Sequence, residues 1–177
     1  MVYLNVDKNI KLRLLDFNDS DKLYFIINQN RNHLKRYLSW VKNIKKKDDV
    51  LNFIEESREQ FASDKGFHLC IWYKNKLVGI IGHDIDDEKN SSEIGYWLIE
   101  NYQGKGIITK SCEVLIDYLF SEFDLNKIEI NCALDNKKSI AIPEKLGFKK
   151  EGIIRDNQFL NGKYIDHVVY GKLKKEW

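Results

Sequence analysis

The residues best placed to do chemistry lie in a glycine-rich loop at residues 103–109, Gln-Gly-Lys-Gly-Ile-Ile-Thr. The loop separates a strand-like run, residues 93–99, from an amphipathic helical pattern, residues 107–120. Gly104 and Gly106 have no Cβ, so the chain can turn sharply and a ligand can approach the backbone closely. The start of the helix adds unpaired N–H groups and the positive end of the helix dipole. These features together predict a site for phosphate or pyrophosphate, and hence for a nucleotide-like cofactor.

Three ligand chemistries use such a loop. A triphosphate-binding P-loop ends in Gly-Lys-Ser/Thr, but Thr109 stands where its glycine should be, so we reject it. A dinucleotide fingerprint needs a third glycine at that same position and is disfavoured for the same reason. The third chemistry is a loop that holds the pyrophosphate of an acyl-coenzyme A. Gln103 and Gly106 match that pattern, and Ile108 stands where a small residue is usual. The alternative, a strand-to-helix turn without a ligand, is weakened by a second motif further along the chain.

Composition limits the class of protein. The chain has 177 residues, and no repeat or linker-like segment divides it, so we expect a single domain over residues 1–177. It has 29 basic and 27 acidic side chains, which leave no overall basic field for nucleic acid. No apolar run approaches the roughly 18 residues of a membrane span, and the first residues lack a signal-peptide pattern. We therefore expect neither nucleic acid nor membrane as a partner.

The three cysteines, Cys70, Cys112 and Cys132, are odd in number and widely spaced. Such spacing predicts neither a disulfide framework nor a zinc site, and indicates a reducing compartment. We therefore expect a cytoplasmic protein without a metal, in which each cysteine is a small buried side chain.

Alternating elements follow from hydrophobic periodicity and turn residues. The expected strands are residues 10–14, 67–73, 77–85, 93–99, 127–132, 148–154 and 164–173. The expected helices are a first one capped by Asp19 or Ser20 and reaching residue 29, residues 30–38, one capped by Asp48 or Asp49 and reaching residue 61, residues 107–120, and residues 136–146. A hairpin-rich front half followed by strand, helix, strand and helix predicts an α+β fold. Its sheet should be mixed and mostly antiparallel, with helices on both faces.

The second motif is Asn-Lys-Lys-Ser-Ile-Ala-Ile-Pro-Glu-Lys-Leu-Gly-Phe at residues 136–148. Asn136 is a good N-cap, and Leu-Gly-Phe at its end reads as a helix terminus with glycine just beyond it. Pro143 removes the N–H that would bond to the carbonyl of Ser139, so the helix should be loosened beside Ser139.

The two motifs at this spacing resemble the GNAT family of N-acetyltransferases, and within it the RimJ/RimL-type branch that acetylates N-termini of ribosomal proteins. The runs Glu-Ile-Gly-Tyr-Trp at 93–97 and Asn-Gly-Lys-Tyr-Ile-Asp at 161–166 fit that branch. The resemblance covers essentially the whole chain. It implies acetyl-CoA as co-substrate and direct transfer of its acetyl group, in a ternary complex, to a primary amine. The expected amine is the N-terminal α-amino group of a ribosomal protein, and a homodimer is a family-level expectation.

The resemblance also implies where acetyl-CoA binds. The strand at 93–99 should splay from the strand at 127–132, helped by a bulge at Gly95, and the pantetheine arm should lie in the gap. The residues implied in cofactor binding are Tyr96, Trp97 and Leu98 through their backbone, Gln103, Gly104, Lys105, Gly106, Ile108 and Thr109 around the pyrophosphate, and Asn136 beside the arm. Since alternate residues of a strand face opposite ways, either Tyr96 or Trp97 should be an ordinary core residue.

Two catalytic roles follow. Many members of this family place a tyrosine in the second-motif helix to protonate the leaving thiolate, and Pro143 stands in that place here. Ser139 is the replacement that the RimL branch implies, and a simple capping serine is the alternative. The branch also carries a glutamate where this chain has Gln158, which cannot accept a proton usefully. Glu93, acting through a water, is the remaining candidate base, with an ordinary strand-edge role as the alternative.

His68, His83 and His167 are expected to be sheet-face residues rather than bases. A weak base suits an α-amine, which is roughly a tenth neutral at pH 7, better than a lysine amine. Two alternatives stay open. One is an N-acetyltransferase of small molecules such as polyamines, antibiotics or amino acids, and the other is a non-catalytic protein that binds acyl-CoA.

Overall fold

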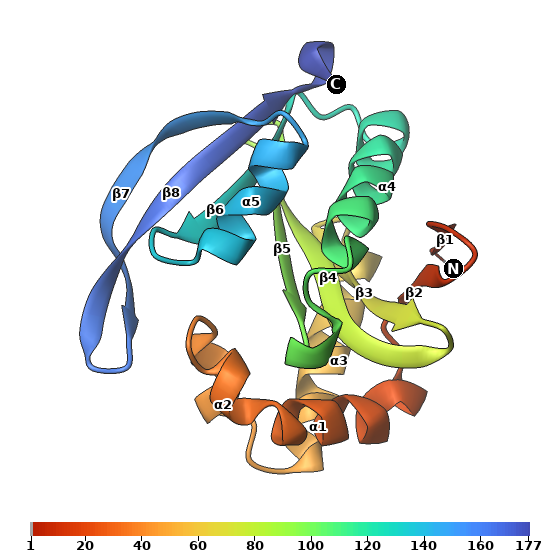
Figure 1. Ribbon diagram of the computed structural model, residues 1–177. Helices are drawn as coiled ribbons and strands as arrows, with labels where there is room; N and C mark the ends of the chain where they lie inside the picture. The colour runs from red at the N-terminus through yellow and green to blue at the C-terminus, as the bar shows by residue number, and fades with distance from the viewer. Residues whose placement is uncertain (1) are drawn as a thin grey trace.

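The computed structural model describes residues 2–177, and its centre is an eight-stranded sheet (Figure 1). The strand order is β1-β2-β3-β4-β5-β6-β8-β7. The strands are β1 (Tyr3–Asn5), β2 (Ile10–Leu14), β3 (Gly66–Tyr73), β4 (Lys76–Asp86), β5 (Ser91–Leu98), β6 (Lys127–Ala133), β7 (Lys149–Leu160) and β8 (Lys163–Leu173). Neighbouring strands are antiparallel except β5 and β6, which are parallel. The expected mixed and mostly antiparallel sheet is confirmed.

Helices cover both faces of this sheet. They are α1 (Ser20–Gln29), α2 (Arg31–Leu34), α3 (Lys47–Ala62), α4 (Ile107–Glu122) and α5 (Lys137–Lys145), with short 3-10 turns at η1 (Phe17–Asp19), η2 (Ser39–Lys42), η3 (Glu100–Tyr102) and η4 (Lys174–Glu176). Helices α4 and α5 lie in front of the sheet in Figure 1, and α3 lies behind it.

Two hydrophobic cores reflect this arrangement. The first joins α4 and α5 to one face of the sheet and includes Leu69, Leu115 and Ile140. The second joins α1 and α3 to the opposite face and includes Leu23 and Cys70. Leu69 and Cys70 are consecutive residues of β3 and enter different cores, because side chains of a strand alternate between faces. The central strands are therefore buried on both sides.

The α3 helix begins earlier than its acidic residues suggest. Asp48 and Asp49 were the expected caps, but the helix starts at Lys47 with Lys46 in the N-cap position. The Asp49 carboxylate accepts hydrogen bonds from the main-chain N–H groups of Lys45 and Lys46, at 2.8 and 2.9 Å. It acts from inside the first turn, as the acidic partner of a capping box does.

Other boundaries differ in length. The expected helix at residues 30–38 is helical only over Arg31–Leu34. The Arg31 side chain then donates to the carbonyls of Val41 and Ile44, both at 2.6 Å, so the following segment folds around this side chain instead of continuing the helix. The strand β1 was not expected at all, and β7 extends to Leu160 rather than residue 154.

The β3–β4 hairpin turn agrees with expectation. Lys74 and Asn75 have φ of +48° and +63°, which is the pair of left-handed residues that a tight type I′ turn requires. No helix among residues 2–177 is long and apolar enough to cross a membrane.

Candidate active site

The parallel strands β5 and β6 diverge in the middle of the sheet. Their register is limited to three pairs, Ser91 with Lys127, Ser92 with Ile128, and Glu93 with Glu129. Beyond Glu93, β5 pairs only with β4 and β6 only with β8. Each diverging strand leads into a helix, β5 into α4 and β6 into α5, so both helices begin at the same end of the gap. Ligands of open α/β sheets bind at such a point.

The expected bulge at Gly95 is wrong. Gly95 pairs with Gly82 in the regular register of β4 and β5, without a shift. The separation of the strands therefore comes from the end of β5–β6 pairing after Glu93 and not from an extra residue in β5.

The glycine loop has the conformation that an anion site requires. Gly104 and Gly106 have φ of +74° and +73°, and a Cβ built on either would meet no atom within 4 Å. Gly106 is the N-cap of α4, and the first intrahelical bond runs from the N–H of Lys110 to the Gly106 carbonyl at 3.1 Å. The N–H groups before Lys110 therefore lack intrahelical partners and border an open space, which fits a pyrophosphate.

The Ile108 departure from the usual small residue has a local explanation. Its side chain is buried and packs in the first core, so it points away from the open side of the loop. A large side chain at this position leaves the loop backbone accessible. Thr109, one residue further, is partly buried in the first turn of α4.

Gln103 links the loop to two other elements. Its amide nitrogen lies 2.8 Å from Nε2 of His33 in α2, and its carbonyl accepts a hydrogen bond from Nζ of Lys138 in α5 at 2.8 Å. Lys105 lies with its Nζ 4.9 Å from the Tyr102 ring centroid. Lys105 and Lys138 are both exposed cations beside the loop, and Lys138 was not expected there.

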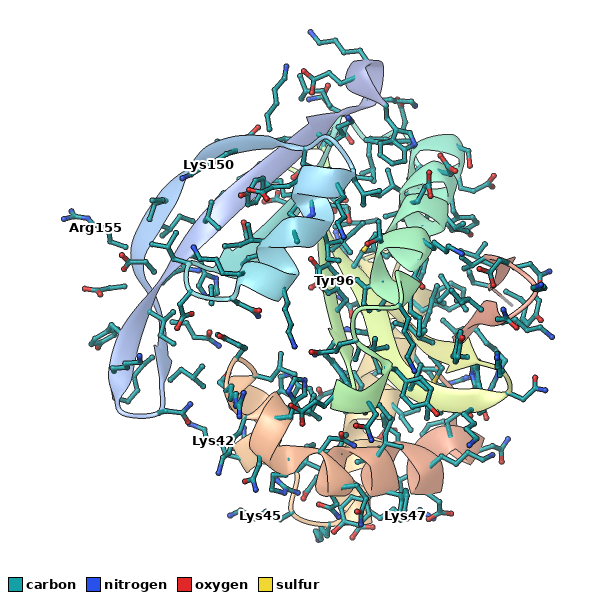
Figure 2. All side chains as sticks on the ribbon, in the orientation of Figure 1. Lys42, Lys45, Lys47, Tyr96, Lys150 and Arg155 are labelled. Atoms are coloured by element: carbon teal, nitrogen blue, oxygen red, sulfur yellow. The ribbon has the colours of Figure 1, made fainter. Side chains whose placement is uncertain are left out.

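Tyr96 and Ser139 meet across the gap between β5 and α5. Figure 2 labels Tyr96 near the centre of the molecule, and its hydroxyl donates to the Ser139 main-chain carbonyl at 3.1 Å. The Ser139 Oγ lies 3.4 Å from that hydroxyl and 3.2 Å from Sγ of Cys132 on β6. Asn136 is the N-cap of α5, as expected, and its Oδ1 accepts from the Ser139 N–H at 3.3 Å. Burial raises the pKa of Tyr96 well above its ordinary value, so the phenol stays protonated.

Tyr96 and Trp97 face opposite sides of the sheet, as the alternation predicts. Tyr96 packs against the first core, whereas Trp97 packs against the second, where its ring lies 5.9 Å from that of Trp40. Leu98 is buried and pairs with Gly79 of β4. Over residues 94–98 the edge of β5 that faces β6 has no strand partner, so its main-chain groups can bind an extended arm.

Glu93 lies at the point where pairing ends. The Glu93 side chain is exposed to solvent on one side and surrounded by protein on the other. The loss of solvent around its carboxylate is the largest cause that raises its pKa. A hydrogen bond from Asn131 lowers the pKa, the carboxylates of Asp84 and Glu129 raise it, and Lys89 lowers it. The Glu129 carboxylate is itself paired with Lys127 at 2.7 Å.

Gln158 and three of the histidines, His68, His83 and His167, lie on strands of the sheet. Gln158 Oε1 lies 3.3 Å from Nε2 of His167, whose pKa is lowered by burial. His68 and His83 lie on the central hairpin, bonded to serine hydroxyls at 3.1 and 2.9 Å, and burial lowers the pKa of both. The expectation that the histidines of the central hairpin are sheet-face residues is confirmed.

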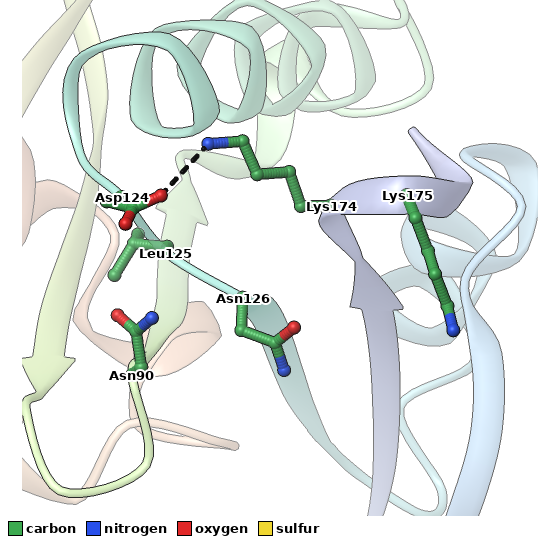
Figure 3. Close-up of a pocket in the computed structure, with 6 residues that line it drawn as sticks. All are labelled: Asn90, Asp124, Leu125, Asn126, Lys174 and Lys175. Atoms are coloured by element: carbon green, nitrogen blue, oxygen red, sulfur yellow. Dashed lines mark hydrogen bonds and ion pairs between the residues drawn. The ribbon is translucent and has the colours of Figure 1, made fainter.

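A surface pocket elsewhere contains none of the expected site residues. It lies between the β4–β5 turn, the α4–β6 connection and η4 (Figure 3), where Lys174 reaches Asp124 at 3.5 Å. Main-chain hydrogen bonds of Asn126 to Asn90 and to Lys174, both 2.9 Å, hold the three segments together. Within residues 2–177 no group of three or more His, Cys, Asp or Glu side chains is arranged to hold a metal, and all three cysteines are free and buried.

Comparison with known proteins agrees with this geometry. Residues 9–149 match the family described as the acetyltransferase (GNAT) domain, and the chain belongs to this family. YdaF of Bacillus subtilis, a candidate ribosomal N-acetyltransferase, is 38% identical over the full chain and 98% of its own length. The ribosomal-protein-serine acetyltransferase of Escherichia coli is 27% identical, with 96% of each chain covered. A microcin self-immunity acetyltransferase, MccE, solved with acetyl-CoA and AMP, superposes with a TM-score of 0.91 at 33% identity, covering 95% of this chain and 94% of MccE. The chain is thus an acetyl-CoA-dependent N-acetyltransferase.

Proposed function

We propose that the protein transfers the acetyl group of acetyl-CoA to the N-terminal α-amino group of a protein, by direct attack in a ternary complex. The observation that carries the proposal is the alignment of three features along the β5–β6 gap: the open glycine loop at one end, the unpaired edge of β5 beside it, and the Ser139 hydroxyl facing across. The acceptor that we propose is a ribosomal protein. Because ribosomal proteins are made in the cytoplasm, the enzyme would act there. We propose one catalytic domain spanning residues 1–177.

The expected cofactor contacts run along the gap, from the glycine loop to the free edge of β5. The pyrophosphate would receive hydrogen bonds from main-chain N–H groups of Gly104, Lys105, Gly106 and Ile108, with Thr109 and Gln103 beside them. The Lys105 and Lys138 ammonium groups would screen its charge. The pantetheine arm would bond to the free edge of β5 at Tyr96, Trp97 and Leu98, and Asn136 would border it from α5.

The reaction forms a C–N bond and breaks a C–S bond and an N–H bond. The neutral amine nitrogen attacks the thioester carbonyl carbon, a C–N bond forms, and the C–S bond breaks with its electron pair on sulfur. The Ser139 hydroxyl donates a hydrogen bond to that thiolate as its charge develops. A thiol of ordinary pKa, about 8.5, is a fair leaving group, so such assistance suffices. The proton lost by nitrogen goes to solvent, with Glu93 as the nearby carboxylate that receives it through water.

The α-amine fits the weak base of this site. Gln158 accepts from His167 and offers no proton acceptor of useful basicity. An α-amine with a pKa of about 7.8 is roughly a tenth neutral at pH 7, whereas a lysine amine is neutral only about 0.04% of the time. The names of the Bacillus and Escherichia relatives refer to ribosomal acceptors, which is consistent with a protein N-terminus.

One observation favours a second candidate, a small cationic amine. Asp84, Glu93 and Glu129 lie opposite one another on three neighbouring strands, so three carboxylates share one side of the sheet at the gap. Such a trio attracts a polycation such as a polyamine. The Lys127 ammonium group pairs with Glu129 and reduces this charge, which is why we place the candidate second.

Steady-state kinetics with matched acceptors tests the proposal. The acceptors are a peptide with a free N-terminus, the same peptide with its N-terminus blocked and an internal lysine free, and spermidine. We expect the highest kcat/KM for the free N-terminus and intersecting double-reciprocal lines, since a ternary complex forms. Parallel lines would indicate a covalent acyl-enzyme. A preference for spermidine would establish the second candidate instead.

A further inference from the structure

The Ser139 carbonyl in α5 has an unusual hydrogen-bond partner. In an α-helix this carbonyl would accept from the N–H of residue 143, four positions on. Residue 143 is proline and has no N–H to donate. The structure supplies a donor from another element, because the Tyr96 hydroxyl on β5 donates to the Ser139 carbonyl at 3.1 Å. Tyr96 and Pro143 lie 47 positions apart in the sequence. Tyr96 therefore supplies the hydrogen-bond donor that Pro143 lacks.

This bond determines what the Tyr96 oxygen can do next. A phenol has one proton with which to donate a hydrogen bond, and here that hydrogen bond goes to the Ser139 carbonyl. The Tyr96 oxygen can then only accept from the Ser139 hydroxyl, whose Oγ lies 3.4 Å away. Burial keeps the phenol protonated, so its role as a donor to the carbonyl holds across the working pH range.

Ser139 is consequently held at its main chain from both sides. The Asn136 side chain accepts from its N–H at 3.3 Å, and Tyr96 donates to its carbonyl. Its hydroxyl proton, in contrast, has only weak acceptors, the Tyr96 oxygen at 3.4 Å and the Cys132 sulfur at 3.2 Å. A stronger acceptor placed in the gap, such as a thiolate, can therefore attract that proton without breaking a strong hydrogen bond.

We propose that Tyr96 is a positioning residue: its hydroxyl replaces the amide proton that Pro143 lacks and holds Ser139 where its hydroxyl can assist the leaving thiolate. The proposal rests on the acetyl transfer proposed above and deepens it. Tyr96 itself transfers no proton in the reaction. Its effect on the rate passes entirely through Ser139.

A double-mutant cycle between Tyr96→Phe and Pro143→Ala tests the idea. At saturating acetyl-CoA we expect Tyr96→Phe to lower kcat by roughly five- to tenfold, the effect of one neutral hydrogen bond, with KM for acetyl-CoA within about twofold. The Pro143→Ala substitution restores a main-chain N–H that can bond to the Ser139 carbonyl. In the Pro143→Ala background the same tyrosine change should therefore cost less than about twofold. An equal loss in both backgrounds, or no loss in either, would overturn the proposal.

A second cycle separates positioning from direct catalysis. In the Ser139→Ala background, Tyr96→Phe should cause no further loss of kcat, whereas a tyrosine that acted directly on the thiolate would cause one. Tyr118→Phe on α4 is the matched control, because this tyrosine packs near Phe67 and Phe123 on α4's side of the sheet and belongs to no part of the site. It should leave kcat unchanged.

Thermal unfolding makes failure of the contact distinguishable from failure of the proposed function. It needs no substrate, and Tyr96→Phe should lower the Tm by about 2–4 °C in the natural background and by less in the Pro143→Ala background. Loss of this coupling would refute the contact itself. Intact coupling with an enzyme that acetylates no amine would refute the proposed function, and with it the role of Tyr96 in the reaction.

Discussion

Replacement of Gly106 by alanine gives a quantitative test of the pyrophosphate site. Gly106 has φ of +73°, and a Cβ built there projects into open space. The variant therefore changes two things: it strains the backbone, and it places a methyl group where we expect the phosphates. Valine would add the strain of a β-branched side chain, so alanine is the sharper probe.

Gly162 separates the two effects. It lies in the β7–β8 turn with φ of +82°, and a Cβ there also meets no atom within 4 Å. The left-handed conformation costs an L-residue about 1–2 kcal/mol, so Gly106→Ala and Gly162→Ala should each lower the Tm by roughly 2–8 °C. Only Gly106→Ala should weaken the binding of acetyl-CoA. Loss of one charge-assisted hydrogen bond to phosphate, about 1.5–3 kcal/mol, corresponds to a Kd roughly ten- to hundredfold weaker.

Isothermal titration calorimetry with acetyl-CoA measures the difference, after circular dichroism has shown that both variants are folded. An unchanged Kd in folded Gly106→Ala would refute the assignment of the loop. An equal loss of affinity in Gly162→Ala would show that general destabilisation, and not the loop, is responsible.

Three further predictions concern the reacting groups and the core. Ser139→Ala should lower kcat by roughly ten- to hundredfold with the Kd for acetyl-CoA unchanged, and a kcat within about twofold of the natural enzyme would make Ser139 purely structural. The kcat/KM should rise with pH and level off near the pKa of the acceptor amine. Glu93→Gln should lose activity mainly at the acidic end, where a proton acceptor matters most, and Gln158→Glu should extend activity to lower pH; a profile that levels off well below the acceptor pKa would contradict these assignments. Burial lowers the pKa of His83 to about 3, so the folded state binds fewer protons than the unfolded chain and stability should fall as the pH drops below 6.5 toward 3. His83→Gln should flatten that fall in urea unfolding, and an equally steep fall would show that other groups cause it.

Local patterns were sufficient to predict most of the fold. The Lys74-Asn75 turn, the glycine loop before α4 and the Asn136 cap of α5 each depend on residues that are neighbours in sequence. The end of α2, in contrast, depends on a tertiary contact. The helix α2 ends early because the Arg31 side chain bonds to carbonyls ten and thirteen residues away, and no periodic pattern contains that information.

Some features of the candidate site could likewise be predicted from the sequence, and others depend on contacts that only the fold creates. The glycine loop could be found from its own residues, and Ser139 is what the resemblance to the RimL branch implies. The absence of a helix N–H at Pro143 could be derived from residue type alone. The donor that compensates for it could not be derived, since Tyr96 lies 43 residues from Ser139 and only the sheet brings them together. The His33, Gln103 and Lys138 contacts likewise join three elements that are distant in sequence. The bulge expected at Gly95 was wrong because strand divergence needs only the end of pairing, which depends on the partner strand.

The position of the acetyl group on a product tests the central claim most directly. A peptide with both a free N-terminal α-amine and an internal lysine is incubated with acetyl-CoA and the enzyme at pH 7, and fragment-ion mass spectrometry locates the modification. We predict a single acetyl group on the α-amine, because that amine is neutral far more often than the lysine and the site has only a weak base. Acetylation of the lysine in preference to the α-amine would contradict the proposed function, as would an enzyme that binds acetyl-CoA and leaves the peptide unmodified.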